Sequence, residues 1–243
     1  MIFNKLLKTP NDVFQVILDS IEDRRKLLLT YLNQHSYNIY YEHSNYRKVL
    51  DEEFMIYQAD LGIYLALRIL GINLLSRLNG TDLNYLLLKK ISQKTIPIVL
   101  VGGKFEEEFV FTEAKKRGIK VNCYINGYFS EEEEEHIIKN ISQFDANVIM
   151  VGMGVPKQEL FAHKVSQHLG NCIIICVGNF FEFYFGTKKR TPVFIRKLGL
   201  EWFFRLLNEP GRLWKRYIRG IPVFFYRILK LKYQTKGKLY PKK

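Results

Sequence analysis

Apolar positions in the first third of the chain recur three or four residues apart, which is the spacing of one face of an amphipathic helix. Val13, Val16 and Ile17 show this spacing most clearly. Three segments of this region are predicted to form helices: 11–34, 44–58 and 82–91. Thr81 or Asp82 is suited to cap the third helix, because short polar side chains accept hydrogen bonds from the first free N–H groups.

Beyond residue 95 the pattern changes to short, uninterrupted apolar runs that alternate with helical segments. Four runs are predicted to be strands: 96–101, 121–125, 147–151 and 172–177. The helices are predicted in four places: up to Arg117, from Ser130, from about Pro156 and over 193–207. This alternation is typical of a parallel sheet that is covered on both faces. The predicted fold class is therefore α/β, with a Rossmann-like, mostly parallel sheet and helices on both faces.

Positive charge is concentrated at the end of the chain. Residues 187–243 carry 17 Lys and Arg against two Asp and Glu, a net charge of +15, whereas residues 1–186 have a net charge of −2. We therefore expect a catalytic domain over 1–186 and a basic, amphipathic helical appendage over 187–243. Such a segment suits anionic lipid headgroups, pyrophosphate or nucleic acid, and charge alone does not choose among them.

Other features of the composition narrow the class of protein. No apolar run approaches the roughly 18 residues needed to span a bilayer, and the N-terminus lacks the layout of a secretory signal. Three cysteines are too few for a disulfide framework, and the chain has neither an HExxH pair nor an Asp-x-Asp motif. We expect a cytoplasmic protein that needs no metal and no cofactor.

The turn after the third predicted strand carries the most specific motif. It joins two glycines, a proline and three polar residues: Gly152, Gly154, Pro156, Lys157, Gln158 and Glu159. Glycine lets the backbone approach a ligand closely, and free N–H groups at a helix start suit a phosphate. As a bare glycine turn, it fits a ligand loop and a tight packing turn equally well. The three adjacent polar side chains favour the ligand loop, and we expect them to converge on a crevice at the carboxyl ends of the strands.

Two further groups of residues have both a structural and a functional interpretation. Asp60 precedes an apolar stretch, where capping a helix is the commoner role and acting as a general base is the alternative. Arg205 follows Glu201 by four positions, which predicts a local ion pair. Arg212 and its neighbours at 215 and 216 could clamp a diphosphate or form a solvated or lipid-facing stripe, and their spacing favours neither.

Seven blocks of the chain, in order, resemble the WecG/TagA/CpsF family (glycosyltransferase family 26). The blocks are Ser36-Tyr37-Asn38, Ala59-Asp60-Leu61-Gly62, Arg77-Leu78-Asn79-Gly80-Thr81-Asp82-Leu83, Gly102-Gly103-Lys104, Gly127-Tyr128-Phe129, Gly154-Val155-Pro156-Lys157-Gln158-Glu159, and a C-terminal block of Lys189-Arg190-Thr191-Pro192, Leu200-Glu201-Trp202-Phe203-Phe204-Arg205-Leu206 and Glu209-Pro210. Leu61 stands between the aspartate and the glycine, which are adjacent in most relatives.

The resemblance implies an inverting, metal-independent transfer of a sugar such as N-acetylmannosamine. The donor would be a UDP-sugar, and the acceptor a polyprenyl-diphosphate-linked sugar at the inner face of the cell membrane. The products would serve cell-surface polysaccharides such as teichoic acid or capsule. The implied fold is a Rossmann-like domain with a C-terminal appendage that contacts the membrane and completes the active site. Nucleic acid is not an expected partner, and a homo-oligomer is left open.

The resemblance also implies roles for single residues. Asp60 would be the general base, and Asn38 and the loop 152–159 would hold the donor. The charge of the departing UDP would be neutralised by a set of cations: Arg205, Arg212, and Arg216 or Lys215. Further substrate contacts are implied at five positions: Arg77, Gly102, Gly103, Gly127 and Arg190.

Two other functions compete with this interpretation. A non-catalytic protein could use the basic segment to bind membranes or nucleic acid, and would tolerate replacement of Asp60 and Gln158. A nucleotide-dependent oxidoreductase could share the fold class. The absence of the third glycine of the dinucleotide-binding motif argues against the oxidoreductase.

Overall fold

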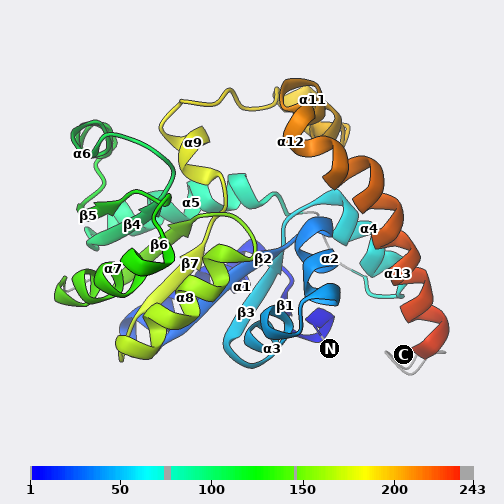
Figure 1. The fold of residues 1–243 in the computed structure, drawn as a ribbon, viewed down its shortest axis with the longest axis horizontal. Helices are drawn as coiled ribbons and strands as arrows, with labels where there is room; N and C mark the ends of the chain where they lie inside the picture. The colour runs from blue at the N-terminus through cyan, green and yellow to red at the C-terminus, as the bar shows by residue number, and fades with distance from the viewer. Residues whose placement is uncertain (1, 74–77, 145–146, 236–243) are drawn as a thin grey trace.

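A computed structural model of the chain describes residues 2–73, 78–144 and 147–235. Within these residues the strands form one sheet in the order β1-β3-β2-β7-β6-β4-β5 (Figure 1). Every pairing in it is parallel. The strands are β1 (Leu6–Leu7), β2 (Leu27–Leu32), β3 (Phe54–Gln58), β4 (Ile98–Gly102), β5 (Val121–Ile125), β6 (Val148–Gly152) and β7 (Ile173–Cys176). The predicted α/β, Rossmann-like fold class is confirmed.

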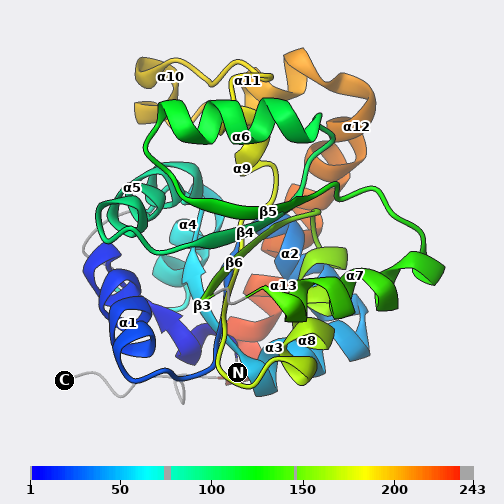
Figure 2. The ribbon, with the colours of Figure 1, turned by 90° about the vertical axis from the view of Figure 1, so that its left-hand side faces the viewer.

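Helices cover both faces of this sheet. They are η1 (Ile2–Lys5), α1 (Pro10–Glu22), α2 (Gln34–Glu42), α3 (Ser44–Glu53), α4 (Leu61–Ile69), α5 (Gly80–Gln93), α6 (Glu107–Lys116), α7 (Glu131–Gln143), α8 (Lys157–His168), α9 (Phe180–Tyr184), α10 (Val193–Lys197), α11 (Glu201–Asn208), α12 (Pro210–Trp214), η2 (Lys215–Arg219) and α13 (Gly220–Thr235). Figure 2 shows α1 and α5 on one side of the sheet and α7 and α8 on the other. Each face has its own buried apolar cluster, as expected for strands that are apolar throughout.

The second half of the sheet follows the sequence prediction closely. The four predicted strands are observed as β4, β5, β6 and β7, with ends that differ by no more than two residues. Ser130 caps α7, and its side chain and that of Glu133 each accept a hydrogen bond from the other's backbone N–H. Acidic residues fill the first turn of this helix, where the helix dipole favours negative charge.

The first predicted helix, over residues 11–34, is wrong. The helix ends at Glu22, and residues Leu27–Leu32 form β2 in the middle of the sheet, between β3 and β7. The run Leu-Leu-Leu-Thr-Tyr-Leu is apolar on both faces, which suits a central strand. The helical spacing of apolar residues belongs to α1 alone, and the apolar run after Glu22 belongs to a strand.

Three smaller corrections concern element ends. The predicted helix 44–58 stops at Glu53, and Phe54–Gln58 form β3, because this segment pairs with β1 and β2. The predicted helix 193–207 is divided into α10 and α11 around Gly199, whose φ of 77° is a left-handed conformation that favours glycine. Asn79, rather than Thr81 or Asp82, caps α5.

The C-terminal helices pack against the carboxyl end of the sheet and along one flank of it. In Figure 1, α11 and α12 lie above the sheet, and α13 runs beside α2 and α4. Phe224 and Ile228 of α13 are fully buried in the same cluster as Tyr37 of α2. No helix within the described residues combines the length and the hydropathy of a membrane span.

Candidate active site

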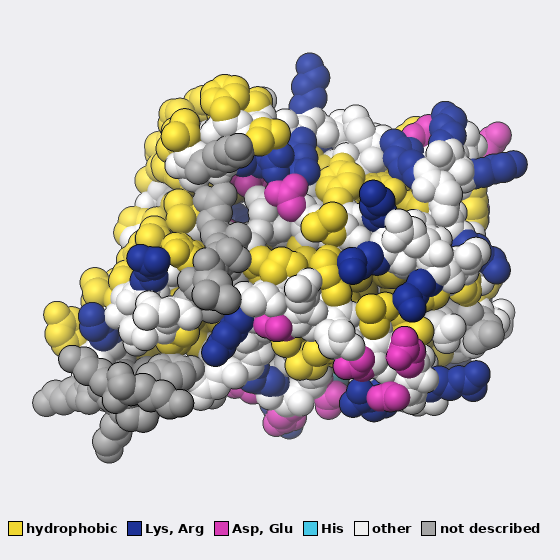
Figure 3. Space-filling model, turned by 180° about the vertical axis from the view of Figure 1, so that it is seen from behind, with side chains coloured by type: hydrophobic (Ala, Val, Ile, Leu, Met, Phe, Trp, Pro, Cys, Tyr) yellow, Lys and Arg dark blue, Asp and Glu magenta, His cyan; other side chains and the backbone are white. Residues whose placement is uncertain are grey.

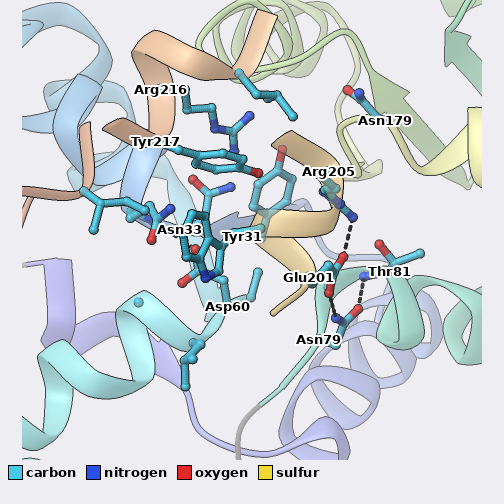
Figure 4. A pocket seen from close by; sticks show the side chains of 18 of the residues that line it. Tyr31, Asn33, Asp60, Asn79, Thr81, Asn179, Glu201, Arg205, Arg216 and Tyr217 are labelled. Atoms are coloured by element: carbon cyan, nitrogen blue, oxygen red, sulfur yellow. Dashed lines mark hydrogen bonds and ion pairs between the residues drawn. The ribbon is translucent and has the colours of Figure 1, made fainter. Parts of the chain in front are cut away.

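A pocket of about 490 Å³ lies at the carboxyl ends of β2, β3 and β7, and we call it the main pocket. Its floor comes from the residues that follow these strands, including Asn33, Asp60 and Asn179. Its other wall comes from α11, α12, η2 and the start of α13, including Arg205 and Arg216 (Figure 4). The pocket therefore lies beyond the carboxyl ends of parallel strands, where such sheets usually bind ligands.

Asp60 caps α4 and also lines the main pocket, so both of its predicted interpretations have a structural basis. One carboxylate oxygen accepts a hydrogen bond from the Ile63 N–H at 2.8 Å, and the other accepts one from the Gln34 N–H at 3.2 Å. Burial raises the pKa of Asp60 above its usual value, and these hydrogen bonds and Arg216 oppose the rise. A carboxylate has about four lone-pair directions, so this one keeps acceptor capacity for a substrate hydroxyl.

The structure adds amide side chains that the sequence interpretation did not include. Asn33 caps α2 and lines the main pocket, and Asn79 and Asn179 line the pocket as well (Figure 4). Asn33 directly follows the apolar run of β2, and this placement at a strand end would have identified it had the strand been predicted. Tyr31, the residue before last in β2, also faces the pocket, and its hydroxyl lies against Gly178.

Asn38, expected to hold the donor, lies outside the main pocket. Its side-chain N–H donates to the Gly220 carbonyl at 2.8 Å, and its side-chain oxygen accepts from Arg227 at 3.0 Å. Arg227 also pairs with Glu42 at 2.6 Å. In this structure Asn38 therefore fastens α13 to α2. Arg77, another expected contact, lies outside the described residues.

The predicted cations are divided between the pocket and its surroundings. Arg205, Arg212 and Arg216 line the main pocket, whereas Lys215 lines a neighbouring hollow. Arg205 pairs with Glu201 at 2.5 Å, which confirms the predicted local ion pair. Glu201 in turn accepts a hydrogen bond from Asn79 at 2.9 Å, so the pair connects α11 to the start of α5 (Figure 4).

Arg190 has a structural partner at the surface of the sheet domain. Its guanidinium lies 2.5 Å from one oxygen of Asp82 and stacks over the ring of Tyr85. Arg196 reaches the other oxygen of Asp82 at 2.7 Å. These contacts hold the segment between α9 and α11 against α5, outside the residues that line the main pocket.

The predicted glycine turns form a second, smaller hollow of about 150 Å³, which we call the glycine hollow. Its lining includes the glycines that end four adjacent strands, Gly103, Gly127, Gly152 and Gly178, together with Lys157 and Asn179. Asn179 lines the main pocket as well, so the two spaces adjoin at the end of β7. Gly102 is required for packing, since a Cβ there would lie 2.4 Å from the Gly152 carbonyl oxygen.

Only one of the three adjacent polar side chains, Lys157, reaches a hollow. Its ammonium donates to the Phe129 carbonyl at 3.2 Å and lies over the Phe129 ring. Gln158 and Glu159 are fully buried beneath the crevice instead of converging on it. Gln158 accepts a hydrogen bond from the Gly178 N–H at 3.0 Å, and therefore positions the backbone next to Asn179.

Glu159 is buried against β2 and is held by two side chains. One of its oxygens accepts hydrogen bonds from Thr30 at 2.7 Å and from Gln158 at 2.8 Å. Its other oxygen is buried and has no hydrogen-bond partner among the described residues. Burial raises the pKa of Glu159 to about 7. Protonation would turn the second oxygen into a hydroxyl and remove the cost of a buried charge.

The outer surface of the C-terminal helices is rich in apolar and basic side chains. Figure 3 shows hydrophobic side chains gathered along this flank, with Lys and Arg among them. The most exposed are Val193, Phe194, Leu198, Leu207, Trp214, Tyr226 and Tyr233. Among the residues placed by the structure, no group of three or more His, Cys, Asp or Glu side chains could hold a metal ion.

Comparison with known proteins agrees with the resemblance found in the sequence. The model of the Glycosyl transferase WecG/TagA/CpsF family matches residues 4–238. A protein of Bacillus spizizenii, N-acetylglucosaminyldiphosphoundecaprenol N-acetyl-beta-D-mannosaminyltransferase, is 30% identical over 192 residues, which cover 78% of this chain and 73% of that protein. The family model spans both the sheet and the C-terminal helices that enclose the main pocket. The chain therefore belongs to the WecG/TagA/CpsF family of glycosyltransferases and is a hexosyltransferase.

Proposed function

We propose that the protein transfers N-acetylmannosamine, or a closely related sugar, from a UDP-sugar to a polyprenyl-diphosphate-linked acceptor sugar. The reaction inverts the anomeric centre, needs no metal, and serves cell-surface polysaccharide synthesis. The name of the Bacillus spizizenii relative supports this substrate class. The observation that carries the proposal is a partly buried carboxylate, Asp60, in one pocket with Arg205, Arg212 and Arg216.

Asp60 is the proposed general base. It removes the proton of the acceptor hydroxyl as that oxygen attacks the anomeric carbon, because a neutral hydroxyl is a poor nucleophile. The bond from the anomeric carbon to the donor phosphate breaks, and UDP leaves with the electron pair. Attack from the face opposite UDP inverts the configuration. The raised pKa of Asp60 suits this role, since a stronger base takes the proton more readily.

The departing UDP is proposed to be stabilised by three arginines of the main pocket: Arg205, Arg212 and Arg216. Guanidinium groups donate two parallel hydrogen bonds to phosphate oxygens and remain charged at all physiological pH values. In a pocket enclosed on several sides they offset the developing charge more strongly than they would in water. The glycine hollow, which adjoins the main pocket at Asn179, is the proposed place for the rest of the nucleotide.

The C-terminal helices are proposed to bring this pocket to the inner face of the cell membrane. Exposed apolar side chains such as Phe194 and Leu198 can enter the interface, while nearby Lys and Arg contact anionic headgroups. Residues 1–186 then act as the catalytic domain and residues 187–243 as the appendage that closes the pocket against the bilayer.

The proposal is tested by incubating the protein, in the presence of EDTA, with a panel of UDP-sugars and a short-chain prenyl-diphosphate-N-acetylglucosamine. We expect the acceptor to gain the mass of one N-acetylhexosamine, with a β linkage formed from an α-linked donor. Absence of any mass gain with all donors, or a strict requirement for added metal, would contradict the proposal.

A further inference from the structure

A further hollow, lined by basic side chains, adjoins the main pocket between α2 and the consecutive helices α12, η2 and α13. It measures about 530 Å³ and is open to solvent on one side. Its lining includes His35 and Asn38 from α2 and four cations from the C-terminal helices: Arg212, Lys215, Arg216 and Arg219. We call this space the basic hollow. In Figure 1, α12 lies above α2, and α13 runs beside α2.

Most of this positive charge is not neutralised within the part of the chain that the structure describes. Lys215, Arg216 and Arg219 form no ion pair there. The Nε atom of Arg216 is buried and has no hydrogen-bond partner among the placed residues. A buried donor without an acceptor is costly, so this group is suited to an anionic ligand.

The remaining polar groups of the basic hollow do not cancel the charge. Glu42, its one acidic lining residue, is already paired with Arg227 at 2.6 Å. Arg212 pairs with Glu209 at 2.6 Å, and Lys188 lies 3.5 Å from the same carboxylate. Burial, reinforced by Arg216, lowers the pKa of His35 to about 4, so the imidazole is neutral at physiological pH and can donate a hydrogen bond.

The basic hollow adjoins both the main pocket and an exposed apolar stretch of α13. Arg212 and Arg216 line both spaces, so an anion held in the hollow would lie next to the sugar site. The basic hollow itself includes Val223 of α13, which is 39% exposed, and Tyr226 on the next turn is 67% exposed. Arg219 and Val223 are four residues apart and share a helix face, so the cations Lys215 and Arg219 lead into an apolar row that Val223 and Tyr226 form on α13. Lys215 and Arg219 are the first and last residues of η2, which is a π-helical turn. This geometry is often found at functional sites.

We propose that the basic hollow binds the diphosphate of the lipid-linked acceptor, separately from the diphosphate of the donor; this inference rests on the proposed function. The acceptor has three parts in a fixed order: a sugar, a diphosphate and a prenyl chain. With its sugar in the main pocket and its chain along the apolar row, its diphosphate must lie between them, where Lys215 and Arg219 are placed. The donor diphosphate needs the arginines inside the main pocket when its bond to the anomeric carbon breaks. The acceptor diphosphate therefore requires a second cationic site.

The test uses the full-length Lys215→Ala, Arg219→Ala and double variants, with Lys230→Ala as a control of equal charge change on an exposed part of α13. Steady-state kinetics with a water-soluble short-chain acceptor, without vesicles, removes any effect of membrane binding. We expect the acceptor KM to rise about tenfold for each single variant. This rise corresponds to the loss of one charge-assisted hydrogen bond worth about 1.5 kcal/mol. The donor KM and the kcat at saturating acceptor should change less than twofold, and the control should match the wild type.

Calorimetry with a short-chain prenyl diphosphate that lacks the sugar separates this inference from the proposed function. We expect the wild type to bind it in the presence of saturating UDP, and the double variant to lose that binding. If the wild type makes no product but shows this pattern, the transferase proposal fails while the site stands. The inference is overturned if the variants change only the donor KM, if they weaken only the binding of anionic vesicles, or if UDP displaces the prenyl diphosphate.

Discussion

Replacing the proposed base, Asp60→Asn, tests catalysis and folding separately. Asparagine is as good a helix cap as aspartate, so its side-chain oxygen can still accept from the Ile63 N–H. The second hydrogen bond, from the Gln34 N–H at 3.2 Å, is lost because the amide NH₂ faces another donor. Leaving one partly buried donor unpaired costs about 1–2 kcal/mol of unfolding free energy.

The effect of Asp60→Asn on turnover should be much larger than its effect on stability. Removal of a general base lowers the rate by roughly 10²–10⁴-fold, whereas UDP binding should change little, because no arginine is altered. The assays are kcat under saturating substrates, UDP affinity by calorimetry, and urea unfolding. Asp12→Asn is a control for the loss of charge alone, since one oxygen of Asp12 accepts both of its backbone hydrogen bonds at a helix start and Asp12 does not line the main pocket.

The pH dependence provides a second measure of the same carboxylate. A decrease in pH should lower kcat/KM as Asp60 becomes protonated. Because burial raises the pKa of Asp60, the midpoint of this fall should lie at a higher pH than for an ordinary aspartate. Loss of UDP binding in Asp60→Asn, or an unchanged kcat in a folded variant, would refute the assignment of Asp60 as the base.

Three further predictions concern other parts of the molecule. Asn33→Ser should keep the cap of α2, so its unfolding free energy should stay within about 0.5 kcal/mol of the wild type. It should lower kcat/KM at least tenfold if the amide contacts substrate, and unchanged kinetics would place Asn33 outside the mechanism. Glu159 has a folded-state pKa of about 7 against an ordinary value of 4.5, so stability should decline as pH rises from about 4.5 to about 7, by up to about 3 kcal/mol. Glu159→Gln should flatten this decline in urea unfolding, and an equally steep decline in the variant would show that another group is responsible. The double variant Phe194→Ser and Leu198→Ser removes two side chains that are 66% and 69% exposed, and should weaken vesicle binding by about tenfold or more while UDP affinity stays constant; unchanged co-sedimentation with anionic vesicles would exclude this surface from membrane contact.

The half of the sheet from β4 to β7 could be predicted because local signals agree there. Each strand is a short, mainly apolar run with a glycine at its end or within two residues of it, and a helix start such as Ser130 can be identified after it. The central strand β2 was missed because its apolar run follows a true helix without a proline or glycine between them. Its strand character comes from its position between β3 and β7, which is a property of the tertiary structure.

The site was only partly predictable for the same reason. Asp60, Arg205, Arg212 and Arg216 were expected, and the structure brings all four to one pocket although they are separated by up to 156 positions. Asn33 was missed because its strand was missed, whereas Asn38, which the resemblance implied, lies outside the main pocket. No spacing rule could show that Gln158 and Glu159 are buried, since their partners come from β2 and the end of β7.

The central claim is that one pocket, formed by the sheet's carboxyl edge and the C-terminal helices, transfers a sugar with Asp60 as the base. A single-turnover experiment tests it most directly, with excess enzyme, UDP-N-acetylmannosamine, a prenyl-diphosphate-N-acetylglucosamine acceptor and EDTA. We predict formation of the β-linked disaccharide product by the wild type and a rate at least roughly 100-fold lower for Asp60→Asn. Equal rates for the two proteins, or no product from the wild type, would contradict the claim.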